Sequence, residues 1–540
     1  MRIELKGTTF TVVGGFRELT KAQVQQQLLD AGAKITKNLA QRTEVMIVGW
    51  SGDAKQARRA KARGLPIIEE AELFKLLKNG DLTIEESAEE LPEEIECMDV
   101  DGAIQELREL LSKGCKYYWQ EICDCLDKAE SSSLPLLADY VASHVCSLVN
   151  EELVKNCSPS AVERYRARPF EAPFDWVQDM LQGKDSPKFR VILTLNLGSL
   201  HMTRKIASKV LECHSLSNVV VLNLSGNRLS GAFFKDLAQA EQFSKVEKLL
   251  LSGHALSAKA ASHLSNSRSF SQLKHLRFLS VDMSKGNALG NLFANNAFSE
   301  LESLRLDACG LKPKDWNDFA EAIHLTQLKQ LDIGDRSYVE RNQFDEESLR
   351  TLLTAPHLSQ LEELGLSDSF IAPWLGETLR YATNLSNLKR LRLCRSSVDS
   401  TLLDAITECS HLDGLEELMV GSTKIPQESW LRYLSSPNAS QLRHIKLWER
   451  NLDDDFAKTL ARSSHLQELR IVEAPKAKIT DSGVQAMAKA PHLADLERLW
   501  VDVRSVSDNG LQVIRESPYW SGEFKESLCK SVLDRRKLFS

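Results

Sequence analysis

The chain has 540 residues, of which 42% are apolar and 26% charged, and its formal net charge is −7. This length is too great for one hydrophobic core and predicts several domains. The negative charge excludes a general attraction to nucleic acid or to anionic membranes, and no apolar run reaches the roughly 20 residues that cross a bilayer.

The N-terminal sequence MRIELKGTTF has no apolar stretch of the kind found in secretory signals. The chain has 11 cysteines, an odd number, and they are scattered along it. Without an export signal such cysteines are expected to be reduced thiols. We therefore expect a cytoplasmic protein with no membrane association.

Residues 1–80 alternate strands with helices and carry 14 Lys and Arg against 8 Asp and Glu. This order predicts a small parallel sheet with helices on its faces. The predicted strands are 8–16, 44–50 and 65–68, with another after the first helix, and the predicted helices are 21–35, 53–64 and 69–77.

These residues resemble a BRCT domain, particularly the one at the end of NAD-dependent DNA ligases. The resemblance covers about residues 3–79 and rests on the stretches 10–16, 31–34, 43–49 and 54–77. The K-x-D-G nucleophile motif of a ligase is absent from the sequence, as is a four-cysteine zinc module. The resemblance therefore implies an association module without ligase chemistry.

Some BRCT domains bind a phosphate through a hydroxyl just before the first-strand glycine and a lysine that opens the second helix. Val13 stands at the hydroxyl position here, so this pocket is incomplete. The second helix still carries basic residues that can share one face and contact a DNA or phosphate group. The alternative is a solvated helix face, favoured by the lack of interleaved aromatic residues. The basic residues are Lys55, Arg58, Arg59 and Arg63.

Residues 81–101 contain ten acidic residues and no basic one, which is typical of a solvated linker. The alternative is an acidic tether that folds back on the basic first domain. Residues 102–188 follow, with two stretches of helical periodicity and then a segment rich in proline and aromatic residues. We expect this segment to cap the N-terminal end of a repeat domain.

Several potential metal ligands lie in this helical region, at Cys115, Cys123, Cys125, His144 and Cys146. Two residues that are two positions apart on a helix point in nearly opposite directions, so Cys123 and Cys125 cannot easily hold one ion. We expect buried thiols and no metal.

From residue 189 to about 518 the pattern L-x-x-L-x-L recurs, mostly every 27 residues. Such units resemble leucine-rich repeats of the ribonuclease-inhibitor-like class. The resemblance implies a curved β/α solenoid of about 12 repeats, with strands along one side and helical halves of about 11–14 residues along the other. Residues 519–540 depart from the pattern and are expected to cap its C-terminal end. The first apolar positions are Ile192, Val219, Val246, Leu276, Leu301, Leu328, Leu361, Leu388, Leu415, Leu442, Leu469 and Leu496.

Two features of the repeats are irregular. The asparagine expected eight positions after the first apolar residue occurs once, as Asn227, and other residues such as His254 and Arg336 hold the place elsewhere. We therefore expect less regular turns than in the best examples of the family. One unit is 33 residues long and contains an insertion, residues 334–344, which predicts a loop at the rim.

Side chains two, four and six positions after the first apolar residue face away from the core, because side chains alternate along a strand. In the first repeats these residues are mostly small or polar, as at Thr194 and Asn223. In the later repeats they include the aromatic, Met and Arg residues that dominate binding surfaces. The alternative is that the two tryptophans cover neighbouring leucines. The predicted partner-binding residues are Arg390, Arg392, Met419, His444, Lys446, Trp448, Ile471, Arg498 and Trp500.

No phosphate-binding loop, nucleophile elbow or zinc-protease motif occurs in the sequence. We expect an α/β multidomain protein that is not an enzyme, uses no cofactor and is monomeric. The favoured function is a scaffold that holds a protein on the concave strand face of the repeats. The BRCT-like domain would dock a second protein or DNA. The alternative is a DNA repair or replication factor whose BRCT-like domain binds DNA or a repair complex.

Overall fold

The computed structural model divides the chain into two compact units, which are described separately below. The first comprises Met1–Leu137 and Asn150–Glu171, and the second comprises Ala138–Val149 and Ala172–Ser540. The described residues are 2–13, 21–36, 43–48, 65–69, 72–73, 76–77, 81–83, 100–113, 118–148, 170–227, 229, 231–334, 342–367, 374–394, 396, 398–421, 425–449 and 451–537.

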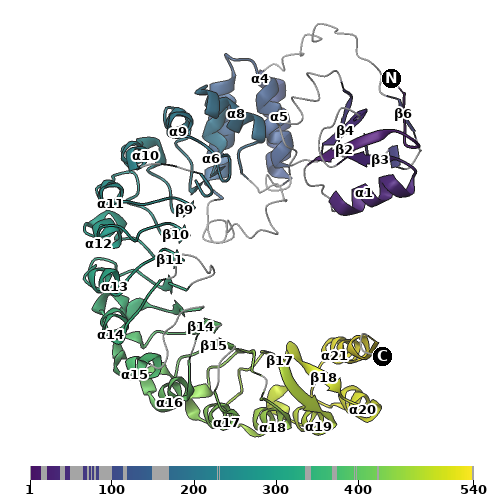
Figure 1. Ribbon diagram of the computed structural model, residues 1–540. Helices are drawn as coiled ribbons and strands as arrows, with labels where there is room; N and C mark the ends of the chain where they lie inside the picture. Colours follow the sequence, from purple (N-terminus) through teal and green to yellow (C-terminus); the bar gives the residue numbers. More distant parts are fainter. Residues whose placement is uncertain are drawn as a thin grey trace. The chain divides into compact units, whose positions relative to one another are not determined.

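The N-terminal domain contains the predicted parallel sheet, with strand order β3-β2-β4-β5 (Figure 1). The predicted basic helix at 53–64 lies outside the described residues. A separate antiparallel pair joins β1 to β6, so strand pairing reaches three residues into the segment expected to be a linker. The elements are β1 (Arg2–Glu4), β2 (Thr9–Val13), α1 (Lys21–Asp30), β3 (Lys34–Thr36), β4 (Val45–Val48), β5 (Ile67–Glu69) and β6 (Asp81–Thr83).

The two faces of β2 are buried in different ways. Phe10 and Val12 point into the main core of the domain, which also contains Leu28 of α1. Val13 lies on the opposite face and packs with Met46 in a smaller apolar cluster. Strand alternation explains this division, because neighbouring residues point to opposite sides of the sheet. The position that a phosphate-binding hydroxyl would occupy is therefore a buried valine.

Three helices follow: α4 (Val100–Ser112), α5 (Trp119–Lys128) and α6 (Leu134–Cys146). Cys123 and Cys125 of α5 are both buried, the arrangement expected of structural thiols. Burial raises the pKa of Cys125 to about 11, so this thiol stays protonated at neutral pH.

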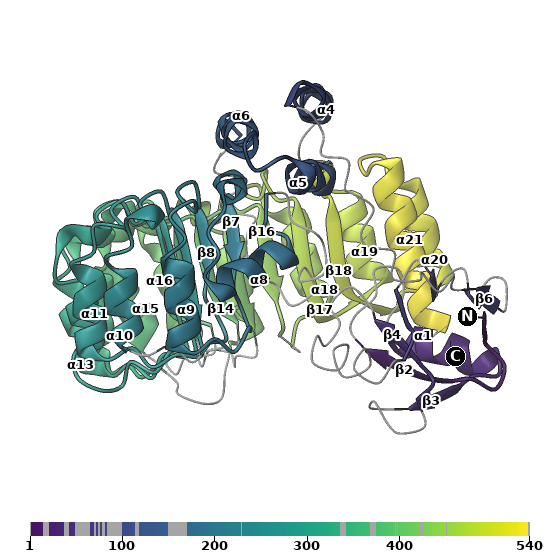
Figure 2. The ribbon, with the colours of Figure 1, turned by 90° about the horizontal axis from the view of Figure 1, so that it is seen from above.

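The repeat domain is built on one sheet of 12 parallel strands in sequential order. Figures 1 and 2 show the strands along the inner side of an arc and the helices along its outer side. The strands are β7 (Thr194–Asn196), β8 (Val221–Asn223), β9 (Lys248–Ser252), β10 (His275–Leu279), β11 (Ser303–Asp307), β12 (Gln330–Asp332), β13 (Glu363–Gly365), β14 (Arg390–Cys394), β15 (Glu417–Gly421), β16 (His444–Leu447), β17 (Ile471–Thr480) and β18 (Arg498–Ser505).

The outer helices are shorter than the predicted 11–14 residues, since α12 has only five residues and the longest have nine. A 3-10 turn takes up the second part of most outer segments. Pro356, Pro437 and Pro491 each begin such a turn, because proline cannot continue an α-helix. The helices are α9 (Arg204–Leu211), α10 (Gly231–Leu237), α11 (Ala258–Ser265), α12 (Ala288–Leu292), α13 (Pro313–Ala320), α14 (Glu346–Leu353), α15 (Trp374–Tyr381), α16 (Ser400–Glu408), α17 (Gln427–Leu434), α18 (Asp454–Arg462), α19 (Asp481–Ala488) and α20 (Asp508–Glu516).

The register of β10 corrects the predicted start of one repeat. Leu276 pairs with Leu249 and with Leu304, which are the second apolar residues of their own units. Leu276 is therefore also a second apolar residue, and the unit begins at the buried Leu273. The distances in sequence between the first apolar residues of this unit and its neighbours then become almost regular.

A second correction concerns the turn asparagine, which has a counterpart inside the 33-residue unit. The Asn227 side chain accepts a hydrogen bond from the backbone N–H of Met202 and donates to the carbonyls of Leu197 and Leu224. The Asn342 amide likewise accepts from two backbone N–H groups and donates to two strand-end carbonyls. The insertion has displaced this asparagine from the predicted position 336, and residues 335–341 lie outside the described part.

Both ends of the sheet are covered within the second unit. At the first end, α8 (Phe174–Gln182) buries Trp176. Nearby, Arg190 donates two hydrogen bonds, of 2.8 and 2.9 Å, to the carboxylate of Asp139. At the other end, α21 (Gly522–Lys537) buries Phe524 and Val532. An apolar strand edge is thereby shielded from water at each end.

Candidate functional site

The concave face is formed by alternate residues of the strands, as expected. In β10 and β14 the burial pattern is strictly alternating, with partly exposed residues between buried ones. The first repeats differ, since Thr194, Val221 and Asn223 occupy concave positions and are nevertheless buried. The accessible part of the concave face therefore belongs to the later strands.

All nine predicted partner-binding residues lie on this later part, and the sheet register brings them together. One row across the strands runs through Arg390, His444, Ile471 and Arg498, with Glu417 between the first two. The neighbouring row contains Arg392, Met419, Lys446, Glu473 and Trp500 in consecutive strands, β14 to β18. Trp448 follows directly after β16.

The two tryptophans differ in exposure. Trp500 is 41% exposed, which is high for so large an apolar side chain and makes it available to a partner. Trp448 is half-buried. A Cβ at position 421, where the chain has glycine, would lie 3.0 Å from the Cβ of Trp448. The ammonium of Lys446 lies 4.9 Å from the Trp448 ring centroid, within cation–π range. Trp448 thus packs against a glycine of the neighbouring strand.

An acidic residue in the same row connects these side chains. Glu473 on β17 contacts the ammonium of Lys446 at 2.6 Å and the guanidinium of Arg498 at 3.1 Å. Burial acts to raise the pKa of Glu473, but the hydrogen bonds from Lys446 and Arg498 outweigh it and lower the pKa. Glu473 is therefore ionised at neutral pH and fixes both basic side chains.

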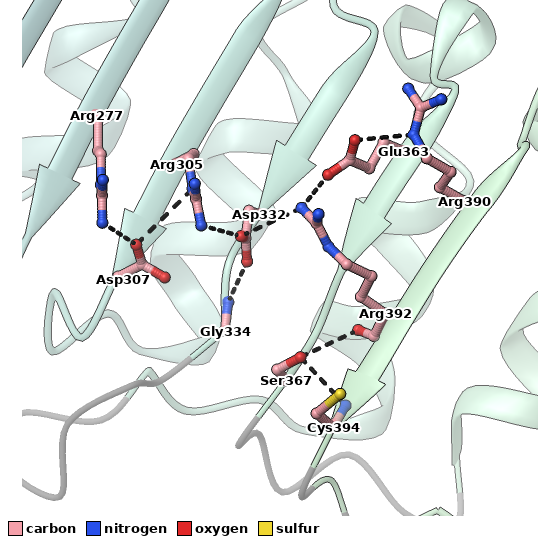
Figure 3. Close-up of polar contacts among 10 residues, drawn as sticks. All are labelled: Arg277, Arg305, Asp307, Asp332, Gly334, Glu363, Ser367, Arg390, Arg392 and Cys394. Carbon is pink, nitrogen blue, oxygen red and sulfur yellow. Dashed lines mark hydrogen bonds and ion pairs between the residues drawn. The ribbon is translucent and has the colours of Figure 1, made fainter. Parts of the chain in front are cut away.

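A larger ion-pair network lies on β10 to β14 (Figure 3). Arg305 donates to Asp332 at 2.7 Å and also lies 3.9 Å from Asp307. Arg392 reaches from β14 across β13 to Asp332 at 3.7 Å and also pairs with Glu363. The remaining pairs are Arg277 with Asp307 at 3.8 Å and Arg390 with Glu363 at 3.0 Å.

Gly365 allows this network to cross a strand. It sits in register between Asp332 and Arg392, and a Cβ at this position would lie 2.6 Å from an oxygen of Asp332. A side chain there would push the carboxylate away, so the glycine leaves the space that Arg392 reaches across.

Several of these residues were missed at the sequence level. Arg277 was missed because the unit was predicted to begin three residues too late. Asp332 lies four positions, and Glu363 two positions, after the first apolar residue of its unit. Both therefore occupy concave positions, as the predicted residues do. The sequence contained that signal, but their pairing across strands required the register.

The predicted DNA or phosphate contacts Lys55, Arg58, Arg59 and Arg63 lie outside the described residues. Within the described part of the N-terminal domain, the arrangement of strands and of α1 agrees with the resemblance noted from the sequence. Residues 3–77 also match the family model of the BRCA1 C Terminus (BRCT) domain. Residues 3–77 are a BRCT domain.

Curated relatives of the chain are bacterial DNA ligases. The DNA ligase of Coxiella burnetii (strain RSA 493 / Nine Mile phase I) is 32% identical over 79 residues, which are 15% of this chain and 12% of the ligase. The DNA ligase of Desulfosudis oleivorans is 34% identical over 77 residues, 14% of this chain and 11% of the ligase. The chain thus spans only about one eighth of the length of these relatives.

Solved structures show weaker similarity. An internalin from Listeria monocytogenes is 16% identical, with a TM-score of 0.38, covering 64% of this chain and 92% of the internalin. A chain of the Rad7 and Elc1 complex in yeast is 13% identical, with a TM-score of 0.38, covering 78% of this chain and 90% of that chain. Similarity this low adds nothing to the architecture described above.

None of the helices in the described part of the chain has both the length and the apolar character that a membrane crossing requires.

Proposed function

We propose that the protein is a non-enzymatic scaffold whose repeats are leucine-rich repeats of the ribonuclease-inhibitor-like class. The concave face of β14 to β18 holds a protein partner, and the BRCT domain docks a second protein or DNA. The observation that carries the proposal is the alignment of Met419, Lys446 and Trp500 in one row across β15, β16 and β18.

The chemistry of this face supports protein binding. Its strands already pair with one another, so a partner meets side chains and not a free strand edge. Trp500 presents a large apolar surface, and the neighbouring buried Glu473 holds the basic side chains of Lys446 and Arg498. Binding surfaces of proteins concentrate their affinity in such aromatic and Arg-rich centres. The absence of catalytic motifs from the sequence agrees with a role without chemistry.

Cross-linking mass spectrometry on the tagged full chain, in cells that express it naturally, identifies the partner and the contacting residues together. Cross-links of the partner should concentrate at Lys446 and at lysines beside β14 to β18. The double substitution Trp448→Ala and Trp500→Ala should lower capture of that partner at least tenfold, since central aromatic residues often contribute about 2 kcal/mol or more.

The matched control is Tyr381→Ala, because Tyr381 is 62% exposed on the outer helix α15. This variant should capture the partner as the unchanged protein does. Undiminished capture by a folded Trp448 and Trp500 double variant would overturn the proposal.

A second candidate function is a DNA repair or replication factor that uses the BRCT domain to contact DNA. It is favoured by the relatives, which are named DNA ligases. The test is fluorescence anisotropy of the full chain with a short duplex at low and moderate salt. Phosphate contacts predict an affinity that falls steeply with salt and is lost in Arg58→Glu with Arg59→Glu. No binding at low salt would eliminate this candidate.

A further inference from the structure

Acidic and basic residues are not equally accessible on the concave face of β10 to β14. Side-chain exposure is 0% for Asp307, 10% for Asp332 and 12% for Glu363. The four arginines that pair with them are 15% to 30% exposed. Each arginine is therefore more exposed than the carboxylate with which it pairs. We call these the guanidinium cluster: Arg277, Arg305, Arg390 and Arg392.

The buried carboxylates orient the guanidinium cluster in advance. A guanidinium has five N–H donors in a rigid fork, and within the described part of the chain Arg390 directs one hydrogen bond to Glu363. The four guanidiniums outnumber the three carboxylates with which they pair, in a chain whose formal net charge is −7. An anionic group meets prearranged donors here and pays little side-chain entropy.

The cluster is continuous with the aromatic end of the same face. Arg392 is followed in its row by Met419, Lys446, Glu473 and Trp500. Four strand spacings of about 4.8 Å separate β14 from β18, or about 19 Å in all. An extended peptide covers that distance with about six residues at roughly 3.3 Å each.

We propose that the guanidinium cluster and the two tryptophans, Trp448 and Trp500, form one docking surface for an extended acidic segment of a partner protein. Carboxylates of the segment pair with the guanidinium cluster, and an apolar or aromatic side chain about six residues away packs on the tryptophans. This inference rests on the proposed function and specifies the chemistry of the partner.

A nucleic acid fits this surface less well than a peptide does. Its backbone carries a negative charge at every unit, and the partly exposed Glu417 lies beside Arg390 on the path from the cluster to Trp500. A peptide can place its carboxylates only over the guanidiniums and an uncharged residue over Glu417. Charge complementarity thus selects an acidic peptide.

The experiment uses fluorescence anisotropy of the full chain with labelled synthetic peptides. The test peptide has three Glu residues, an uncharged spacer of about six residues and a terminal Leu-Trp pair. A matched peptide replaces the three Glu by Gln, and a short single-stranded DNA is the third probe. We expect the acidic peptide to bind at least tenfold more tightly than the Gln peptide and more tightly than the DNA, with the difference between the peptides shrinking as salt rises.

Arg390→Gln with Arg392→Gln should abolish this preference, whereas Arg350→Gln on the outer helix α14 should preserve it. If the double variant is unfolded, the comparison of the two peptides on the unchanged protein still tests the inference. Equal binding of both peptides, or tighter binding of the DNA, overturns the inference. Capture of the native partner that depends on Trp448 and Trp500, together with no preference for the acidic peptide, overturns this inference alone and leaves the proposed function intact.

Discussion

Trp448 packs directly against Gly421, the residue next to it across the strands. A Cβ at position 421 would lie 2.5 Å from Cε3 of the indole and 3.1 Å from Cδ2. The orientation of an aromatic side chain on the candidate site is therefore set by a residue that has no side chain.

Gly421→Ala should displace the Trp448 ring without unfolding the domain. We expect partner capture to fall about fivefold, or about 1 kcal/mol, measured by titrating the partner identified by cross-linking. Gly414→Ala is the matched control, because a Cβ there would meet only the carbonyl oxygen of Leu388 at 3.8 Å. Equal affinity of both variants would show that the position of Trp448 is unimportant.

Asn342→Ala should destabilise the repeat domain by about 2–4 kcal/mol. The substitution leaves two buried N–H groups and two buried carbonyls without their partner, and each such group is costly. Urea unfolding followed by circular dichroism measures the effect. Asn387→Ala is the control, since the exposed Asn387 amide donates to one carbonyl, that of Ser359, at 2.8 Å. A loss below 0.5 kcal/mol for Asn342→Ala would mean that water replaces the amide.

Gly376→Ala should destabilise the stacking of α15 on α16. A Cβ at Gly376 would collide with backbone atoms of Thr401, which cannot move aside as a flexible side chain can. Overpacking of this kind typically costs about 1–3 kcal/mol. Thermal unfolding should show a lower midpoint for Gly376→Ala, and Gly522→Ala should match the unchanged protein because nothing lies within 4 Å of its Cβ position.

His357 should make the repeat domain sensitive to mild acid. Burial and, to a smaller extent, the neighbouring His324 together lower the pKa of His357 to about 4. Because the unfolded chain takes up the proton near pH 6.5, the folded state loses stability as pH falls from about 6.5 toward 4. At pH 5 this effect of His357 lowers the free energy of unfolding by about 2 kcal/mol.

The measurement compares urea unfolding at pH 7 and pH 5 for the unchanged protein and for His357→Leu. The variant should lose about 2 kcal/mol less between the two pH values, whatever its stability at pH 7. His214→Gln changes an exposed histidine and serves as the control. A pH dependence identical in all three proteins would contradict the assignment to His357.

The sequence predicted the parallel sheet of the repeats, because its strands follow from apolar periodicity. It failed at the phase of one repeat for a physical reason. The sequence around β10 satisfies L-x-x-L-x-L from Leu273 with Phe278 as third apolar residue, and also from Leu276 with Val281. Only the strand register separates the two, since it buries Phe278 and leaves Leu279 half-buried.

The ion-pair network could not be predicted from the sequence for a different reason. Periodicity states which face a side chain occupies, but not which residue of the next strand lies beside it. The contact of Arg392 with Asp332 joins residues two strands apart and depends on the missing side chain of Gly365. The sequence therefore indicated Arg390 and Arg392 but not the carboxylates that hold them.

The displaced asparagine of the 33-residue unit has a consequence for how this chain can change. The extra residues enter between the end of β12 and Asn342, and the same backbone groups are bonded as in a repeat of ordinary length. The loop between β12 and Asn342 can therefore change in length without changing the spacing of the strands. The rim of the arc can gain or lose residues while the concave side chains keep their places.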